Sequence, residues 1–241
     1  MQTGKSRVLE LILENGHRHV RVACSSNLIP SPGQYLLASD DSDSPLPVPL
    51  FYTDSAPSGF VHRTASTLVA AGPIPDSWNP GLEIHLRGPL GRGFTLPSSA
   101  RKVGLVAFDD SPARLNGLIR QALKQGAAVA LVCDSPPDNL PDDVEVHPIS
   151  ALQQILDWSD YAAFDVSREN LNQLRERLGK PNQFAAGQAR GERSPNDAQV
   201  LVRTPVPCGG VAECGVCAVT LKSSWKLACK DGPVFDWSEL G

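Results

Sequence analysis

The sequence predicts a multidomain α/β plus β fold with three parts: an antiparallel β-barrel, a small parallel α/β sheet and a C-terminal cysteine module. Three observations predict these parts. Short β-runs broken by turn residues fill the first part, strands and helices alternate in the second, and four of the six cysteines crowd into the third. We place the boundaries at residues 1–97, 98–183 and 184–241. A chain of 241 residues is long enough for two modest domains and a small module.

Composition narrows the class of protein. The net charge of −4 argues against nucleic-acid binding, which needs a basic surface that releases counterions. Apolar runs such as Ala127–Val132 are too short to cross a bilayer. The N-terminal stretch carries charges inside its apolar run, so it does not have the pattern of a signal peptide. We therefore expect a cytoplasmic protein without membrane contact.

The first part, residues 1–97, lacks a helical period and is predicted to form strands. Asn15-Gly16 is a typical two-residue hairpin turn. Clusters of Gly, Pro, Ser and Asp separate the β-runs, as in a small barrel or sandwich. The runs are Arg7–Leu13, His19–Ala23, Tyr35–Ala38 and Thr67–Ala70.

The second part changes to a βαβ pattern. Val103–Phe108 is an apolar run typical of a buried strand, and Ser111 can cap a helix with Pro112 at its first position. Apolar residues then recur at helical spacing until Gly126, and Ala127–Val132 is a second buried strand. The alternation continues through Val144–His147, Ala151–Asp157, Tyr161–Val166 and Glu169–Leu178. Such alternation predicts a parallel sheet.

The third part begins with a polar stretch (180–198) that is predicted to be a linker. Cys208, Cys214, Cys217 and Cys229 then follow with the spacing C-x5-C-x2-C-x11-C. Thiolates are soft ligands that suit iron–sulfur clusters and zinc. Three ligands in one tight loop and a fourth further on are typical of a plant-type [2Fe–2S] site, whereas structural zinc usually takes two separated C-x2-C pairs. We predict a [2Fe–2S] cluster on these four cysteines, with zinc as the alternative.

The residues around these cysteines favour such a cluster. Glycines let the backbone wrap closely and direct N–H groups toward the sulfurs. They are Gly209, Gly210 and Gly215. Aromatic side chains flank the last ligand, and we expect them to pack over the cluster, with partner docking as the alternative. They are Trp225, Phe235 and Trp237.

No pattern for bond-making chemistry stands out. The histidines are scattered, and no Ser-His-Asp or paired-carboxylate arrangement can be recognised. Cys24 and Cys133 lie in or directly after apolar β-runs, where a lone Cys usually behaves as a small hydrophobe. We expect no catalytic residue in this chain and a packing role for these two thiols.

Four segments, in this order along the chain, carry a resemblance to a known family. They are Pro32-Gly33-Gln34-Tyr35, Gly88-Pro89-Leu90-Gly91-Arg92-Gly93-Phe94, the cysteine loop, and Asp231-Gly232-Pro233-Val234-Phe235. Together they resemble the electron-transfer subunit of NAD-dependent dihydroorotate dehydrogenase, within the ferredoxin-reductase-like flavoproteins. The resemblance implies an FAD-binding, flavin-reductase-like barrel, a NAD-binding α/β domain and a [2Fe–2S] module near a catalytic flavoprotein subunit. In that family, electrons pass from the partner's FMN through the cluster to FAD and NAD.

The cluster and flavin motifs depart from the family's pattern. The family usually has four residues between its first two cysteines, and this chain has five, which the glycines can absorb. The family's Arg-x-(Tyr/Ile/Phe)-Ser holds the FAD pyrophosphate, but the matching residues, Val48–Phe51, lack the Arg. His-Arg-Thr at 62–64 could supply the charge instead. FAD binding therefore stays open. Its expected contacts are Tyr52, Thr53, Gly88 and Gly91.

The nucleotide motifs depart further. The family's glycine-rich turn is replaced by Phe108–Pro112, which contains Asp109 and Asp110, and its Cys-Gly-Pro motif is replaced by Asp165–Ser167. Glycines at this turn let the backbone approach the phosphates. Carboxylates at a helix N-terminus repel a phosphate and take its place. We expect NAD to bind poorly or not at all.

Two functions from different classes remain. The first is an accessory electron-transfer subunit of an oxidoreductase of pyrimidine biosynthesis. Its cluster, and FAD if bound, would exchange electrons with a dihydroorotate dehydrogenase-like subunit in a hetero-oligomer. The second is a non-redox docking subunit whose cluster or zinc only folds the C-terminal module. Visible absorption bleached by dithionite would favour the first function, and a colourless zinc protein would favour the second.

Overall fold

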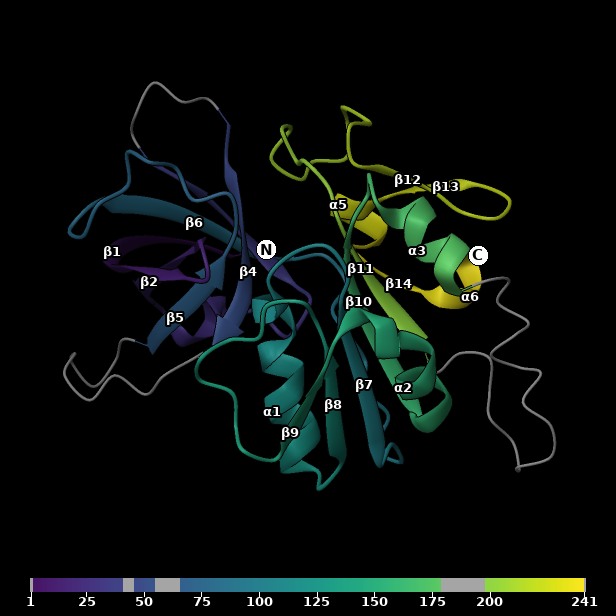
Figure 1. Ribbon diagram of the computed structural model, residues 1–241. Coiled ribbons are helices and arrows are strands. Elements are labelled where there is room, and N and C mark those ends of the chain that lie inside the picture. The colour runs from purple at the N-terminus through teal and green to yellow at the C-terminus, as the bar shows by residue number, and fades with distance from the viewer. Residues whose placement is uncertain (1, 41–45, 55–65, 179–197, 241) are drawn as a thin grey trace.

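The first part of the chain is a closed antiparallel barrel (Figure 1). The computed structural model describes residues 2–40, 46–54, 66–178 and 198–240. The barrel strands are β1 (Gln2–Glu14), β2 (His17–Cys24), β3 (Tyr35–Ser39), β4 (Val48–Asp54), β5 (Ser66–Ala71) and β6 (Glu83–Leu90). They pair in the order β1-β2-β5-β4-β3-β6, and β6 closes onto β1.

Side-chain alternation explains why these segments form a barrel. In β2, Val20 and Val22 are buried while Arg21 between them is half-buried, as expected of a strand with one face on a core. The β1–β2 hairpin turns at Asn15 and Gly16, whose φ angles of 49° and 81° fit the predicted two-residue turn. The interior is filled by Val8, Val20, Val22, Leu36, Leu50, Leu68, Trp78, Ile84 and Leu86.

The second part is a sheet in the order β14-β11-β10-β7-β8-β9. Its strands are β7 (Lys102–Ala107), β8 (Ala128–Val132), β9 (Val144–His147), β10 (Tyr161–Ser167), β11 (Ala198–Arg203) and β14 (Val234–Asp236). The strands from β11 to β9 are parallel, and β14 pairs antiparallel with β11 at one edge. The predicted parallel α/β sheet is therefore confirmed.

Helices cover both faces of this sheet (Figure 1). The described helices are η1 (Ser26–Leu28), η2 (Pro112–Leu115), α1 (Asn116–Lys124), η3 (Ile149–Ala151), α2 (Leu152–Trp158), α3 (Leu171–Leu178), α5 (Ala228–Asp231) and α6 (Trp237–Leu240). α1 packs on one face in a core shared with the barrel, whereas α2, α3 and α6 pack on the other with the cysteine module. Ser111 caps η2 as predicted, because its Oγ accepts a hydrogen bond from the Ala113 N–H at 3.3 Å. None of these helices has the length and apolar character that a bilayer crossing demands.

The division of the chain differs from the sequence expectation in its last part. Residues 184–241 were expected to form a separate unit, yet β11 and β14 both belong to the α/β sheet. The expected linker (180–198) lies, except for its last residue, outside the described residues. The cysteine loop, with the short hairpin β12 (Ala218–Thr220) and β13 (Trp225–Leu227), is thus inserted between two strands of one sheet. Both ends of the loop are held by that sheet.

Candidate metal centre and adjoining cavity

The four clustered cysteines come from one loop and one short helix. Cys208, Cys214 and Cys217 lie between β11 and β12, and Cys229 lies in α5. Cys217 and Cys229 are buried, Cys208 is half-buried and Cys214 is exposed. The thiols meet as two pairs, Cys208 with Cys214 and Cys217 with Cys229. The Cys208 charge also acts on Cys229, so the two pairs adjoin.

Backbone N–H groups of the loop point at the sulfurs. The donors are Val211, Glu213 and Cys214 for the Cys208 sulfur, and Ala212 for the Cys229 sulfur. The loop can wrap around its thiols because Gly209 and Gly210 adopt φ angles of 67° and 75°, a region that favours glycine. Such N–H groups stabilise negative charge on sulfur and orient a metal group that the sulfurs bind.

Cys208 and Cys229 differ in acidity. Burial would raise the pKa of Cys208, but hydrogen bonds from Cys214 and the backbone outweigh it and lower this pKa to about 6. Burial, followed by the hydrogen bond to Cys217 and the charges of Cys217 and Cys208, raises the pKa of Cys229 to about 12. Cys208 is therefore prepared to carry an anion, while Cys229 needs a bound cation to ionise.

This set of thiols is suited to an iron–sulfur group. In the described ranges, no three or more His, Cys, Asp or Glu side chains are grouped as one metal ion would require. Four cysteine thiolates are the ligands that iron–sulfur clusters usually take. The N–H groups that face the sulfurs are the donors that stabilise such an anionic cluster.

The rest of the module holds the ligand positions in place. The Ala228 N–H donates to the Cys217 carbonyl at 3.0 Å, which ties the start of α5 to the loop. Phe235 and Trp237 are buried in the same core as Cys217 and Cys229. Trp225 is not buried there, because 66% of its surface is exposed. The expectation that all three aromatic residues cover the cysteines is therefore wrong for Trp225.

The two remaining cysteines are buried away from this centre. Cys24 ends β2 and belongs to the barrel core, and Cys133 follows β8 in the core beneath α1. Burial raises the pKa of Cys24 to about 11. Burial and the charge of Asp134 raise the pKa of Cys133. Both thiols stay neutral and behave as small apolar groups, as predicted.

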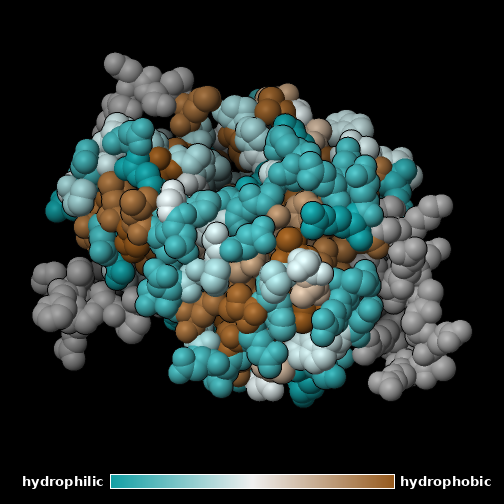
Figure 2. Space-filling view, in the orientation of Figure 1, coloured by the Kyte–Doolittle hydropathy of each residue, from teal (hydrophilic) through white to brown (hydrophobic). Residues whose placement is uncertain are grey.

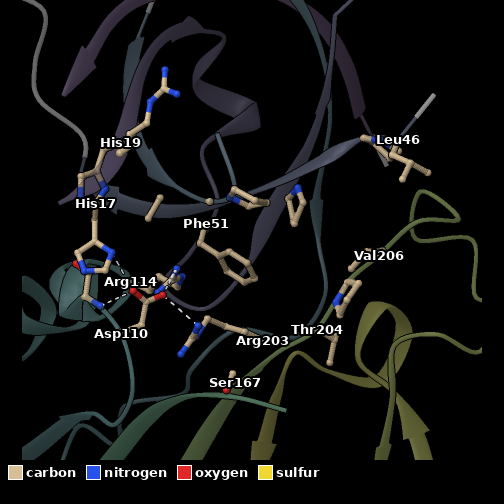
Figure 3. Close-up of a pocket in the computed structure, with 18 of the residues that line it drawn as sticks. His17, His19, Leu46, Phe51, Asp110, Arg114, Ser167, Arg203, Thr204 and Val206 are labelled. Carbon is tan, nitrogen blue, oxygen red and sulfur yellow. Dashed lines mark hydrogen bonds and ion pairs between the residues drawn. The ribbon is translucent and has the colours of Figure 1, made fainter. Parts of the chain in front are cut away.

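A cavity of about 590 Å³ lies between the barrel and the α/β sheet and reaches the start of the cysteine loop (Figure 3). The surface is hollowed between the barrel and the cysteine module (Figure 2). Phe51 from β4 and Val206 contribute apolar walls, and His17, Ser167 and Thr204 contribute polar ones. Pro207, which also lines the cavity, directly precedes Cys208. A group bound in this cavity would therefore adjoin the metal centre.

The structure does not bring the four expected flavin contacts together in this cavity. Tyr52 packs against α1, where a Cβ built on Gly117 would lie 2.4 Å from its ring, and the Thr53 hydroxyl donates to the Val69 carbonyl at 2.8 Å. Gly88 packs against β3 and Gly91 against Gly232 and Pro233, and neither glycine lines the cavity. Strand alternation turns Phe51 and Pro49 toward it instead. Residues 62–64 lie outside the described ranges.

Charged residues at the carboxyl ends of adjacent parallel strands form an ion-pair network. Arg203 ends β11, and its Nε and Nη1 donate to Asp165 at 2.8 Å and to Asp110 at 3.0 Å. Its Nη2 also binds Asp109. Arg114 donates to Asp165 at 3.1 Å and to Asp110 at 3.0 Å. These five residues connect β7, β10, β11 and η2 at the end of the sheet where nucleotide-binding folds place their ligand.

Further polar groups saturate this network. Asp109 accepts hydrogen bonds from the Ser167 N–H at 3.0 Å and from Asn170 Nδ2 at 2.7 Å. His17 on the barrel lies 3.0 Å from Asp110, so the network also joins the barrel to the sheet (Figure 3). Burial would raise the pKa of Asp110, but Arg114, the Ser111 N–H and Arg203 outweigh it and lower this pKa.

The network was only half visible in the sequence. Asp109, Asp110 and Asp165 were recognised as replacing nucleotide motifs, whereas Arg114 and Arg203 were missed. One signal was available, because Arg114 follows Asp110 at helical i,i+4 spacing. Arg203 carried no such signal, since its partners are far away in the sequence. Three carboxylates against two guanidinium groups leave one net negative charge at this end of the sheet, which disfavours a phosphate.

Comparison with known proteins agrees with this arrangement. Residues 208–241 match the iron-sulfur cluster binding domain of dihydroorotate dehydrogenase B. A structure of the NADH-dependent reduced ferredoxin-NADP oxidoreductase is similar over 98% of this chain and 89% of that one, with 15% identity and a TM-score of 0.67. The ferredoxin reductase of carbazole 1,9a-dioxygenase is similar over 84% and 69%, with 12% identity and a TM-score of 0.59.

A third similar structure is the Amycolatopsis cytochrome P450 reductase, with 14% identity, a TM-score of 0.57, and coverage of 83% of this chain and 69% of that one. At such identities these structures show the fold, and the match of residues 208–241 shows the kind of module that the cysteines belong to. The resemblance predicted from the sequence is confirmed. The chain thus combines a fold similar to that of these reductases with a C-terminal segment that matches the iron-sulfur cluster binding domain of dihydroorotate dehydrogenase B.

Proposed function

We propose that this chain holds a [2Fe–2S] cluster on Cys208, Cys214, Cys217 and Cys229 and passes electrons between a flavoprotein partner and an acceptor. The observation that carries the proposal is the meeting of these thiols as two adjoining pairs with backbone N–H groups aimed at their sulfurs. When bound, such a cluster takes up and releases one electron at a time. The loop supplies the ligands, the hydrogen bonds and a partly buried setting for it.

FAD is proposed as a second carrier in the cavity between the barrel and the sheet. A volume of about 590 Å³ is in the range of cofactor sites, and the lining combines apolar side chains with polar and charged ones, among them Arg18 on the barrel. The cavity's position beside Cys208 supports transfer between a flavin and the cluster. Phe51 would pack against the flavin here, at the position where the resembling family has a hydroxyl.

NAD is proposed to have been lost as a cofactor. The carboxylates of Asp109, Asp110 and Asp165 are paired with two arginines at the end of the sheet that would meet the phosphates. NAD bound with its phosphates at this end of the sheet would have to break these ion pairs and bring more negative charge to Asp109 and Asp110. The electron acceptor would then be something other than NAD.

The partner is proposed to be a catalytic, dihydroorotate dehydrogenase-like flavoprotein subunit. The match of residues 208–241 supports this class of partner. Val211, Val216 and Trp225 are large apolar side chains that are exposed on the cysteine module. Exposed apolar groups of this kind are typical of interaction surfaces. A compartment that keeps thiols reduced, such as the cytoplasm, suits the six free cysteines.

The test is anaerobic purification of the full chain with measurement of iron, acid-labile sulfide, zinc and flavin. We expect two irons and two sulfides per chain, about the stoichiometry of this cluster type, with visible absorption that dithionite bleaches. Cys217→Ser should abolish the absorption, whereas Cys133→Ser, the matched buried control, should keep it. Zinc without sulfide, or an unchanged spectrum in Cys217→Ser, would contradict the proposal.

A further inference from the structure

The hydroxyl of Tyr35 is a buried polar group without a hydrogen-bond partner in the described part of the chain. Tyr35 begins β3 and is only 1% exposed. Its oxygen is fully buried, and none of the described residues hydrogen-bonds to it. Buried polar groups are nearly always paired, so this hydroxyl points to an acceptor from outside the polypeptide.

Three of the groups that act electrostatically on this hydroxyl belong to the metal centre, and the fourth is Arg87 on the barrel. The three are Cys229, Cys217 and Cys208. Burial is the main reason why the pKa of Tyr35 is raised, negative charge on these cysteines raises it further, and Arg87 opposes the rise. The hydroxyl therefore stays protonated and is available as a donor toward negative charge.

Close packing fixes the Tyr35 ring in this position. Gly91, with φ 76°, lies so near that a Cβ on it would be 3.1 Å from the ring carbon Cε1 of Tyr35 and 2.5 Å from Cδ of Pro233. Pro233 follows the ligand Cys229 by four positions. The other side of the ring meets Phe51, with centroids 5.5 Å apart. The hydroxyl therefore cannot turn elsewhere without moving the segment that carries Cys229.

Arg87 approaches the same centre from the neighbouring strand β6. A Cβ built on Gly209 would lie 3.3 Å from its Nη2 atom, and one built on Gly210 would lie 3.6 Å from it. Both glycines belong to the stretch between Cys208 and Cys214. The guanidinium group therefore lies directly against the ligand loop, where its charge acts over a short distance.

We infer that the barrel completes the surroundings of the cluster, with Tyr35 donating a hydrogen bond to a cluster sulfur and Arg87 holding a positive charge against the ligand loop. This inference rests on the proposed function. One-electron reduction makes the cluster more negative, so a donor and a nearby cation both favour the reduced state. Tyr35 and Arg87 are thus positioning residues that raise the reduction potential of the cluster.

The test is a redox titration of the anaerobically purified full chain, followed by visible absorption and electron paramagnetic resonance. Tyr35→Phe removes only the hydroxyl, and Arg87→Gln removes only the charge. Each variant should shift the reduction equilibrium at least threefold toward the oxidised form, which is about 28 mV at 59 mV per tenfold change. Iron and sulfide contents should equal those of the wild type.

Two matched variants control for loss of a buried hydroxyl and of a barrel charge. Tyr161→Phe removes a buried hydroxyl that is bonded to Gln199 at 2.9 Å, and Arg7→Gln removes an exposed arginine paired with Glu83. Both should keep the wild-type potential. Potentials of Tyr35→Phe and Arg87→Gln that equal those of their controls would overturn the inference.

A second measurement detects the hydrogen bond itself. Resonance Raman iron–sulfur stretching bands of the wild type should shift in D2O, because the Tyr35 proton and the backbone N–H protons that face the sulfurs exchange, and the part due to Tyr35 should be lost in Tyr35→Phe. Wild-type bands that do not shift in D2O would contradict the proposed hydrogen bond. A wild-type chain without iron or sulfide would instead defeat the proposed function, so the two failures are distinguishable.

Discussion

Arg203 and Asp165 are joined by a 2.8 Å hydrogen bond between the carboxyl ends of β11 and β10. Asp165 is 1% exposed, and Arg114 binds its other oxygen at 3.1 Å. The end of the sheet that faces a nucleotide in other proteins of this fold is thus occupied by ion pairs within the chain. The first two predictions below follow from these ion pairs.

Arg203→Met should lower the free energy of unfolding by about 3–5 kcal/mol, because it leaves buried carboxylates without their main cation. Urea denaturation with tryptophan fluorescence measures the loss. Arg92→Met is the matched control, since Arg92 pairs with Asp236 at 3.1 Å at a more exposed place and should cost at most about 1 kcal/mol. Equal losses in the two variants would show that the network contributes little.

NADH should show no saturable binding to the wild-type chain at concentrations up to about 1 mM, which is well above typical cofactor affinities. The reason is the net negative charge of the network and the occupation of the helix start by Asp109 and Asp110. Isothermal titration calorimetry would measure NADH binding, with FAD titrated in parallel. Micromolar NADH binding would contradict the expectation directly.

Stability should fall as the pH drops below about 6.5, and His19 should cause part of this fall. Burial, the charge of Arg114 and the charge of His17 lower the pKa of His19 in the folded chain. Below the ordinary pKa of histidine, His19 binds a proton in the unfolded chain but not in the folded chain. Lowering the pH therefore favours unfolding until the folded-state pKa of His19 is reached.

Urea denaturation between about pH 7.5 and pH 5.5 would measure this dependence, and His19→Gln should flatten it. The lowered pKa of Asp110 acts in the same direction but only near and below its ordinary value of 3.8, outside this interval. An equally steep profile in His19→Gln would exclude His19 as the cause.

The sequence predicted the parts of the fold that depend on local pattern. The Asn15-Gly16 turn, the cap at Ser111 and the strand Val144–His147 are found where they were expected, because turn chemistry, capping and short-range hydrophobic pattern determine them. The partners of β11 could not be predicted in this way. Its place beside β10 depends on pairing across residues 179–197, which no local signal specifies.

The candidate metal centre was easier to predict than the cavity next to it. Cysteine spacing alone named the four thiols, since ligand chemistry restricts which residues can take such positions. The flavin contacts were assigned by motif position, but the bulge in β4 between Tyr52 and Asp54 and the strand alternation decide which side chains face the cavity. The motif that contains Tyr35 did not indicate that this side chain would lie near the cysteines, because that contact depends on which loop packs against the barrel.

Gly91→Ala should destabilise the chain more than Gly126→Ala. The two glycines have nearly equal φ angles of 76° and 75°, so the backbone strain of an alanine is alike. A Cβ at Gly91 would lie 2.7 Å from the Gly232 carbonyl oxygen, whereas one at Gly126 meets nothing within 4 Å. We expect about 1 kcal/mol of strain in both variants and about 1–3 kcal/mol of additional loss in Gly91→Ala. Thermal unfolding of the two proteins would measure the difference.

Trp225→Ser should weaken the complex with the catalytic flavoprotein subunit by tenfold or more, while stability and the visible spectrum stay unchanged. A large exposed aromatic residue contributes to binding when it is buried at an interface. Its exposure in the free chain means that folding does not depend on it. Analytical ultracentrifugation with the partner would measure the affinity, and Leu13→Ser on the barrel is the control, since Leu13 is 72% exposed. Equal affinities of Trp225→Ser and the wild type for the partner would show that Trp225 lies outside the interface.

The cysteine loop leaves the sheet at β11 and returns to it at β14, so the last strand of the sheet depends on the loop that would hold the proposed cluster. β14 has only three residues, and its pairing with β11 follows directly after α5, which carries Cys229. A subunit made during iron starvation would keep its barrel but fray at this edge. Proteases attack frayed ends first, so the cell could remove empty subunits before they enter a complex that they would only block. Limited proteolysis of loaded and empty chains would show this difference as early cutting near the C-terminus.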